Sequence, residues 1–310
     1  MDAERSMREA YGDALVKLGK EYPDIVVLDA DLAHATCSNT FQTSFPNRFF
    51  NMGIAEQNLF CVSAGMANSG LVPFASTFAI FAAGRAYEPI RNGICYSKSN
   101  VKIMGCHAGI TCCGDGGTHQ CIEDLALMRV LPNMTIFCPC DYDQTQELVK
   151  AAYELKGPVY LRIARPPVPS LPEGSPRTVP GKAQVLAQGK DICIIATGIM
   201  VHTALNAAQT LKKSGIKASV LNIHTIKPFD EETVLDYAKR CGVVITIEEH
   251  STVGGLGSAV SDALIGKAAV KIKKLGVNDR FGQSGLMPEL MKEYCLTPEF
   301  LAESCRELLK

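Results

Sequence analysis

Short apolar runs alternate along the chain with longer stretches of helical periodicity. The apolar runs predict strands at residues 25–28, 71–74, 101–106, 135–138 and 159–163. Between them, apolar positions three and four residues apart predict helices around 7–18, from 56 onward, and over 76–97, 120–131 and 142–155. This alternation is typical of α/β folds, in which helices cover a parallel sheet.

A proline-rich stretch interrupts this pattern. Six prolines fall within residues 166–180, and because proline fixes φ and lacks an amide donor, the stretch is predicted to be an extended linker. Afterwards strands are expected at 191–197, 218–223, 243–247 and 269–275, with helices at 201–213, 231–240, 256–265, 286–294 and 297–309. The sequence therefore predicts two α/β domains, residues 1–167 and 186–310, joined by a linker at 168–185. Each is expected to be a mostly parallel sheet with helices on both faces.

The segment 51–58 (NMGIAEQN) places Glu56 at the start of a predicted helix. Residues 59–83 are almost entirely apolar, so the Glu56 carboxylate is expected to be buried. A buried carboxylate needs a partner or loses its charge. If no lysine or arginine of this chain pairs with it, a basic nitrogen of a ligand could.

Composition narrows the classes of function. The chain has 310 residues, 47% hydrophobic, and a net charge of −1, which suits a packed core but gives no basic surface for nucleic acid or an anionic membrane. Residues 1–24 lack an apolar signal core, and no apolar run is long enough to span a bilayer. The thirteen cysteines form no C-x-x-C pair, which favours reduced structural thiols. A cytoplasmic protein is expected.

Polar residues follow two predicted strands. Asp31 comes after the strand at 25–28, where open α/β sheets bind ligands. The loop after the strand at 101–106 contains His107, Asp115 and His119, which could bind a metal or act as acid–base and hydrogen-bonding groups. Their wide spacing disfavours a metal site, and none is expected in this chain. A polar surface loop is the simpler interpretation.

Two further clusters are open to more than one interpretation. Phe78 and Phe81 have the spacing of core residues, but aromatic faces also stack on flat heterocycles. Glu248, Glu249 and His250 follow a predicted strand and could form a small site in the second domain, although we assign them no catalytic role. The GDGG run at 114–117 fits neither a Walker A sequence nor a dinucleotide fingerprint.

Five motifs occur in an informative order: DADL at 29–32, RFFNMGIAEQN at 48–58, STF at 76–78, GDGGTHQ at 114–120 and TIKPFD at 225–230. Together they resemble the C-terminal half of transketolase over essentially the whole chain. The resemblance implies a pyrimidine-binding domain at 1–167 and a transketolase C-terminal domain at 186–310. Transketolases use thiamine diphosphate to transfer a two-carbon ketol unit from a ketose phosphate to an aldose phosphate. In some organisms the enzyme is split, and this chain resembles the second subunit.

The resemblance also implies roles for individual residues. The glutamate matching Glu56 hydrogen-bonds N1′ of the cofactor's aminopyrimidine and favours the tautomer that deprotonates thiazolium C2. The residues expected around the cofactor are Asp31, Leu32, Met52, Gly53, Glu56, Phe78, Phe81 and Arg85, with Phe81 stacked on the pyrimidine. Those expected at the sugar are Asp115 and His119 at its hydroxyls and His107 and Arg165 at its distal anionic group. Glu56 and His119 are the expected catalytic residues.

A partner subunit is a further implication of the resemblance. The family binds magnesium and diphosphate through a G-D-G followed by an asparagine about thirty residues later, and this chain has no such second motif. We therefore expect activity only with an N-terminal subunit that carries the pyrophosphate-binding domain and most of the Mg²⁺ ligands. A heterotetramer with two copies of each chain is expected.

Departures from the family pattern leave the substrate open. Cys113 stands where transketolases often have glutamate, Gly84 replaces a common tyrosine, and residues 34–37 (HATC) differ from the usual phosphate-binding segment. A sugar with a different anionic end, such as a sulfonate, could replace a sugar phosphate. The sequence is also compatible with a 1-deoxy-xylulose-5-phosphate synthase-like enzyme, a 2-oxo-acid dehydrogenase beta subunit, or a non-catalytic α/β binding protein.

Overall fold

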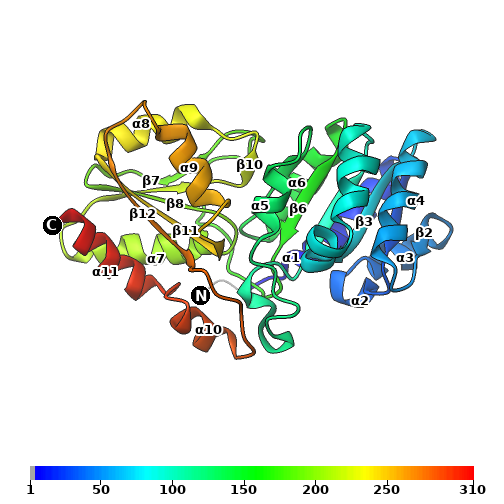
Figure 1. Cartoon of the computed structure of the whole chain (residues 1–310), viewed down its shortest axis with the longest axis horizontal. Helices are drawn as coiled ribbons and strands as arrows, with labels where there is room; N and C mark the ends of the chain where they lie inside the picture. Colours follow the sequence, from blue (N-terminus) through cyan, green and yellow to red (C-terminus); the bar gives the residue numbers. More distant parts are fainter. Residues whose placement is uncertain (1–3) are drawn as a thin grey trace.

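Two sheets form the frame of the molecule (Figure 1). The computed structural model describes residues 4–310, with a seven-stranded sheet in the order β10-β5-β6-β4-β3-β1-β2 and a five-stranded sheet in the order β12-β11-β8-β9-β7. The strands of the larger sheet are β1 (Ile25–Asp29), β2 (Phe49–Asn51), β3 (Val72–Phe78), β4 (Lys102–Cys106), β5 (Thr135–Phe137), β6 (Val159–Ile163) and β10 (Thr225–Lys227). All pair in parallel except β10, which runs antiparallel to β5.

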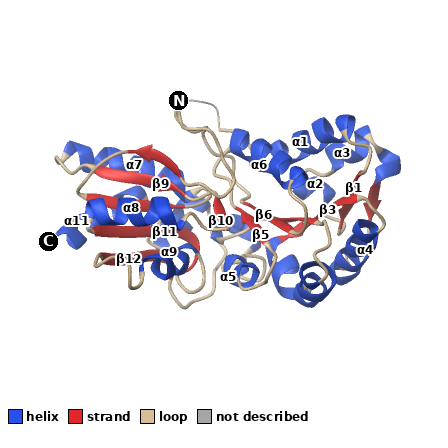
Figure 2. Cartoon of the chain, turned by 90° about the horizontal axis from the view of Figure 1, so that it is seen from above, coloured by secondary structure: helices blue, strands red, loops and turns tan. Residues whose placement is uncertain are grey.

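Helices pack against both faces of the larger sheet (Figure 2). They are α1 (Met7–Glu21), α2 (Ala33–Thr36), α3 (Asn39–Ser44), α4 (Glu56–Asn68), α5 (Asp124–Arg129) and α6 (Tyr142–Glu154). Shorter turns of 3-10 or π geometry are η1 (Pro46–Arg48), η2 (Phe81–Arg85), η3 (Pro89–Tyr96) and η4 (Ile110–Asp115). Side chains alternate between the faces: Val27 and Phe74 join one buried cluster, whereas Leu28 and Ala75 join the other.

The second sheet repeats this design on a smaller scale. Its strands are β7 (Gln184–Ala187), β8 (Ile192–Ala196), β9 (Ala218–Asn222), β11 (Val243–Ser251) and β12 (Lys271–Val277). Its helices are α7 (Met200–Lys213), α8 (Glu231–Cys241), α9 (Leu256–Leu264), α10 (Met287–Glu293) and α11 (Pro298–Leu309). Only β7 pairs antiparallel, with β9. The predicted α/β fold with two mostly parallel sheets is confirmed.

Some predicted elements were wrong. Residues 76–78 were expected to begin a helix, but they finish β3, which lies between β1 and β4 and is buried along its whole length. The rest of the predicted helix is broken into η2 and η3. The expected helix at 120–131 shrinks to α5, and three short strands, β2, β7 and β10, were not predicted. β7 begins at Gln184, inside the stretch expected to be a linker.

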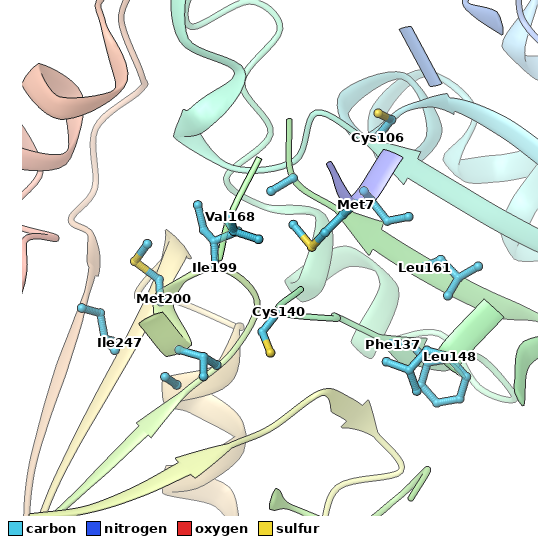
Figure 3. Close-up of a cluster of buried hydrophobic side chains, with 14 of the residues drawn as sticks. Met7, Cys106, Phe137, Cys140, Leu148, Leu161, Val168, Ile199, Met200 and Ile247 are labelled. Carbon is cyan, nitrogen blue, oxygen red and sulfur yellow. The ribbon is translucent and has the colours of Figure 1, made fainter. Parts of the chain in front are cut away.

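The two sheets are joined by buried contacts. The TIKPFD motif contributes β10 to the larger sheet, and Lys227 Nζ donates to the carbonyl oxygens of Arg129 (2.9 Å) and Leu131 (2.5 Å). Figure 3 shows Cys140, Ile199 and Met200 in a buried cluster that includes side chains of both sheets. The carboxyl end of β11 also lies against a loop of the first sheet, where Glu249 accepts a hydrogen bond from the Thr111 hydroxyl at 2.8 Å.

All thirteen cysteines are free. None of the helices in the part of the chain that the structure describes combines the length and apolarity required to cross a membrane.

Candidate active site

The carboxyl ends of four neighbouring strands bring the predicted site residues together. β6, β4, β3 and β1 are adjacent in the larger sheet, and Phe78 at the end of β3 aligns with Cys106 of β4, which aligns with Ile163 of β6. Asp31, His107 and Arg165 each follow the end of one of these strands. Because parallel strands end at one edge of a sheet, residues far apart in sequence converge there.

Glu56 is the first residue of α4, and its side chain is 2% exposed. Its Oε1 accepts a hydrogen bond from Arg85 Nη1 at 3.1 Å, and the Arg85 side chain is 53% exposed. The expected burial of Glu56 is confirmed, and an arginine of this chain does pair with it. Within residues 4–310, Glu56 Oε2 has no hydrogen-bond partner, so one carboxylate oxygen stays available to a ligand.

An aromatic cluster lies beside this ion pair. The Phe78 ring stacks on His107 with centroids 4.1 Å apart and on Phe81 at 5.8 Å. His119 meets Phe81 edge-on at 5.5 Å, and the Arg85 guanidinium lies 4.7 Å from the centre of the Phe81 ring. Phe78 is buried, whereas Phe81 is only partly buried and keeps some of its surface free. Phe78 is thus both a core residue and a wall of the site.

His107 is buried and has a positive φ of 58°, a conformation that costs energy for a residue with a side chain. Burial, reinforced by the positive charges of Arg8 and Arg165, lowers the pKa of His107 to about 3. The imidazole is therefore neutral near pH 7. If it contacts the anionic end of a substrate, it does so as a neutral hydrogen-bonding group and not as a cation.

Arg165 lies in a cleft of about 390 Å³ whose walls also include Arg8, Asp115 and Leu286. Its Nη1 donates to the carbonyl oxygen of Cys112 at 2.7 Å and lies 3.5 Å from Asp115 Oδ1. Arg8, from α1, donates to the carbonyl oxygens of Ala35 and Arg165. Sequence reasoning missed Arg8, because no local pattern distinguishes it and only the packing of α1 brings it to the cleft.

The turn after β1 is held by a buried carboxylate. Asp29 accepts hydrogen bonds from the backbone amide of Leu32 (2.5 Å) and from the hydroxyls of Thr36 (2.8 Å) and Ser38 (2.9 Å). Burial raises the pKa of Asp29 to about 6, although these three bonds oppose the shift. Asp31, with a φ of 63°, is consequently directed outward at the surface.

The segment before α4 lies next to this turn. Asn51 Nδ2 donates to Asp31 Oδ1 at 2.8 Å, and Asn51 Oδ1 accepts from the amide of Gly53 at 3.0 Å. Met52 donates its amide to the carbonyl oxygen of Asp29 at 2.8 Å. Gly53 has a φ of 68°, which glycine adopts without strain. Asp31, Leu32, Met52 and Gly53 are thus placed on one side of the site.

The carboxylates at the end of β11 are engaged by hydrogen bonds from neighbouring groups. Glu248 accepts from the amides of Leu256 and Gly257 at 2.7 Å each and so caps α9, while Glu249 accepts from Thr111 of the first domain. In addition, residues 4–310 hold no group of three His, Cys, Asp or Glu side chains placed to bind a metal ion.

Comparisons with known proteins agree with this architecture. The family model of the transketolase pyrimidine-binding domain matches residues 3–170, and that of the transketolase C-terminal domain matches residues 181–301. A Methanocaldococcus jannaschii protein assigned as a transketolase C-terminal section is 44% identical, over 99% of this chain and 97% of its own length. A 6-deoxy-6-sulfo-D-fructose transketolase subunit of a Clostridium species is 39% identical, over 98% of this chain and 95% of its own length.

Solved structures point the same way. A split-gene transketolase, described as an inactive β4 tetramer, is 50% identical and superimposes with a TM-score of 0.90 over 99% of both chains. The two family models and the relatives matched over nearly their full length identify the same family as the five sequence motifs. The structure agrees with this identification. The chain therefore belongs to the transketolase family and corresponds to the pyrimidine-binding and C-terminal domains of that family, as a split subunit.

Proposed function

We propose that this chain is the C-terminal subunit of a thiamine-diphosphate-dependent transketolase. It acts with an N-terminal subunit to transfer a two-carbon ketol unit from a ketose phosphate to an aldose phosphate. The observation that carries the proposal is the buried Glu56 carboxylate, which keeps one oxygen without a protein partner beside the partly exposed ring of Phe81. A planar, basic heterocycle would satisfy both groups.

The residues present fit an aminopyrimidine. Glu56 Oε2 would hold the proton at N1′, in an apolar setting that strengthens a charge-assisted hydrogen bond. Phe81 would stack on the ring and Phe78 would line its pocket, while Asp31, Leu32, Met52 and Gly53 would form the neighbouring wall. Arg85 would stay paired with Oε1 and balance the buried charge. Once bound, thiamine diphosphate supplies the carbanion stabilisation that side chains lack.

The partner would supply what this chain lacks. The diphosphate and Mg²⁺ motif of the family has no counterpart in the sequence. The relative described as an inactive β4 tetramer is a split-gene transketolase, which supports the proposal that such subunits need a second chain. We propose a heterotetramer in which the partner's pyrophosphate-binding domain completes each site and holds most of the Mg²⁺ ligands.

The sugar would lie across the neighbouring loop and cleft. Asp115 and His119 are proposed to bind its hydroxyls, with His119 also acting in catalysis, and Arg165 with Arg8 to bind its anionic end. Guanidinium groups present several donors in a plane, which suits a tetrahedral oxyanion. Neutral His107 would add one hydrogen bond. Because sulfonate offers similar oxygens, and one relative is named for a sulfosugar, a sulfosugar donor is the second candidate.

Ketol transfer tests the proposal. Xylulose 5-phosphate or 6-deoxy-6-sulfo-fructose would be the donor and ribose 5-phosphate the acceptor, with thiamine diphosphate and Mg²⁺. We expect turnover when this chain and its N-terminal partner are mixed, and none with either chain alone. If only the sulfosugar is turned over, the proposed donor class changes from sugar phosphates to sulfosugars. Cofactor binding by the mixture without transfer from either donor would contradict the transketolase assignment.

A further inference from the structure

Glu249 of the second domain reaches into the loop that carries the proposed sugar-binding residues. Its Oε2 accepts from the hydroxyl of Thr111 at 2.8 Å and from the Thr111 amide at 3.3 Å. The carboxyl group is packed so closely against Gly109 that a Cβ there would clash with Glu249 Cδ. Only glycine, with its φ of 77°, fits at this position. The second domain therefore contacts the loop at two nearby residues, Gly109 and Thr111.

Hydrogen bonds also hold other residues of this loop segment in place. Gln120 Nε2 donates to the carbonyl oxygens of Ile110 (2.9 Å) and Cys113 (3.4 Å), and Arg165 donates to that of Cys112 (2.7 Å). Within residues 4–310, Thr111 is the residue of this segment that hydrogen-bonds to a side chain of the second domain. Without its bonds to Glu249, the turn between His107 and Asp115 would lose one of its anchors.

A gain in folding stability is a weak explanation for the buried carboxyl group of Glu249. Glu249 is 1% exposed, and Arg162, the cation beside it, is engaged by Asp124 through Nε at 2.9 Å. Arg162 Nη1 is 3.9 Å from Glu249 Oε1, and that oxygen is buried without a hydrogen-bond partner in the described chain. Buried ionic groups of this kind are often no more stabilising than apolar ones of similar size. What Glu249 provides is a directed pair of bonds to Thr111.

We propose that Glu249 is a positioning residue for the sugar site: by holding Thr111 it sets the places of Asp115 and His119 relative to His107 and Arg165. This inference rests on the proposed function, because it takes that loop as the sugar-binding loop. It gives the second domain a part in substrate recognition without any contact to the substrate. A loosened loop would weaken donor binding while leaving the cofactor pocket around Glu56 intact.

Thr111→Val tests the link without removing a buried charge. It is made in the full chain and assayed with the partner subunit. We expect the KM for the donor sugar to rise on the order of tenfold, the size expected for one lost hydrogen bond, with thiamine diphosphate affinity unchanged. Thr111→Ser, which keeps the hydroxyl, should restore the KM. Thr145→Val is the matched control, since it removes a buried hydroxyl that donates to the carbonyl oxygen of Asp141 at 2.6 Å at the start of α6.

A second readout needs no turnover. Cys113 is half-buried in this loop, and its thiol donates to the carbonyl oxygen of Thr111 at 3.1 Å. We expect iodoacetamide to label Cys113 several-fold faster in Thr111→Val and in Glu249→Gln than in the wild type, with exposed Cys295 as the internal reference. Mass spectrometry resolves the two sites.

The outcomes separate the two proposals. An unchanged donor KM in Thr111→Val, or a rise that Thr111→Ser does not reverse, would overturn the positioning role of Glu249. The same rise in Thr145→Val would overturn it as well. If the wild-type mixture transfers no ketol unit, the proposed function fails. Cys113 labelling at the wild-type rate in both variants would then also rule out the Glu249–Thr111 link, whereas faster labelling would keep it.

Discussion

The ion pair between Glu56 and Arg85 is asymmetric, because one partner is buried and the other is half in solvent. Removing the arginine would leave a buried carboxylate without a counter-charge, which costs far more than the loss of an exposed pair. We expect Arg85→Gln to lower the free energy of unfolding by about 1–3 kcal/mol. Urea unfolding of the single chain measures this.

A double-mutant cycle checks the cause of that loss. Adding Glu56→Gln to Arg85→Gln should recover part of the lost stability, because the unpaired charge is then gone. Additive losses from the two substitutions would show that the Arg85 guanidinium does not balance the Glu56 charge.

His107 predicts a pH dependence of stability. Its pKa in the folded chain, about 3, lies below the value of about 6.5 in an unfolded chain. As the pH falls from about 6.5, the unfolded chain binds a proton that the folded chain excludes. The free energy of unfolding therefore falls, by up to about 1.4 kcal/mol per pH unit for this one group.

His107→Asn should make the loss of stability between pH 6.5 and 4 less steep, as followed by urea unfolding at each pH. The control is His34→Asn, because the His34 ring is exposed in the folded chain as well. Equal slopes for wild type and His107→Asn would show that the imidazole is not held neutral by its surroundings.

The candidate site residues differ in how clearly the sequence indicates them. Asp31 and His107 could be proposed because each lies just after an apolar strand and parallel strands end together, whereas Arg165 was expected from the resemblance. Arg8 could not be proposed, and Glu249 was assigned only to a possible small site in the second domain. Their actual contacts depend on how α1 and β11 pack on elements remote in sequence. The Glu56–Arg85 pair was likewise left open. The two residues lie in separate helical segments, α4 and η2, and sequence spacing alone does not show whether their side chains point toward each other.

At the scale of elements, β3 shows where periodicity fails. Residues 72–78 (VPFASTF) are all buried, so they show no alternation between apolar and polar positions. A buried segment of this kind, with the polar Ser76 and Thr77 near its end, fits a central strand or a buried helix equally well. The boundary with the following helical segments was therefore misplaced by several residues, whereas β6, bounded by turn residues on both sides, was predicted correctly.

Packing between β4 and β6 gives a prediction at the same scale. A Cβ at Gly105 would clash with the hydroxyl of Tyr160, whose oxygen is fixed by a bond of 2.9 Å to Asp124. We expect Gly105→Ala to lower the free energy of unfolding by roughly 1–3 kcal/mol, as overpacking does. Thermal or urea unfolding measures the effect.

Gly65→Ala is its control. Gly65 lies within α4 with no atom inside 4 Å of its Cβ position, so alanine should be neutral or stabilise by about 0.5–1 kcal/mol. A neutral Gly105→Ala would mean that β4 and β6 are not packed as closely as the structure has them.

The two halves of the molecule are more tightly connected than the proline-rich linker between them suggests. The alternation of strands and helices predicted two sheets, but a three-residue strand such as β10 carries too little pattern to be recognised, and its antiparallel pairing joins the second half of the chain to the first sheet. Buried polar contacts from β11 strengthen the connection. The two halves should therefore unfold together, not as independent domains.

Activity is also a property of the assembly in this account. The chain would provide the carboxylate and the aromatic wall, and the partner would provide the diphosphate and magnesium ligands. We propose that Glu56 supplies the essential acid–base group of a site that the partner completes.

The most direct test is ketol transfer by the reconstituted complex carrying Glu56→Gln, with thiamine diphosphate binding measured in parallel. Loss of a group that shuttles a proton typically costs about 10²–10⁴-fold in rate. We expect kcat to fall by that order while the complex still assembles and binds cofactor, and Glu154→Gln, at an exposed glutamate of α6, to keep wild-type kcat. A Glu56→Gln complex with wild-type kcat would contradict the account.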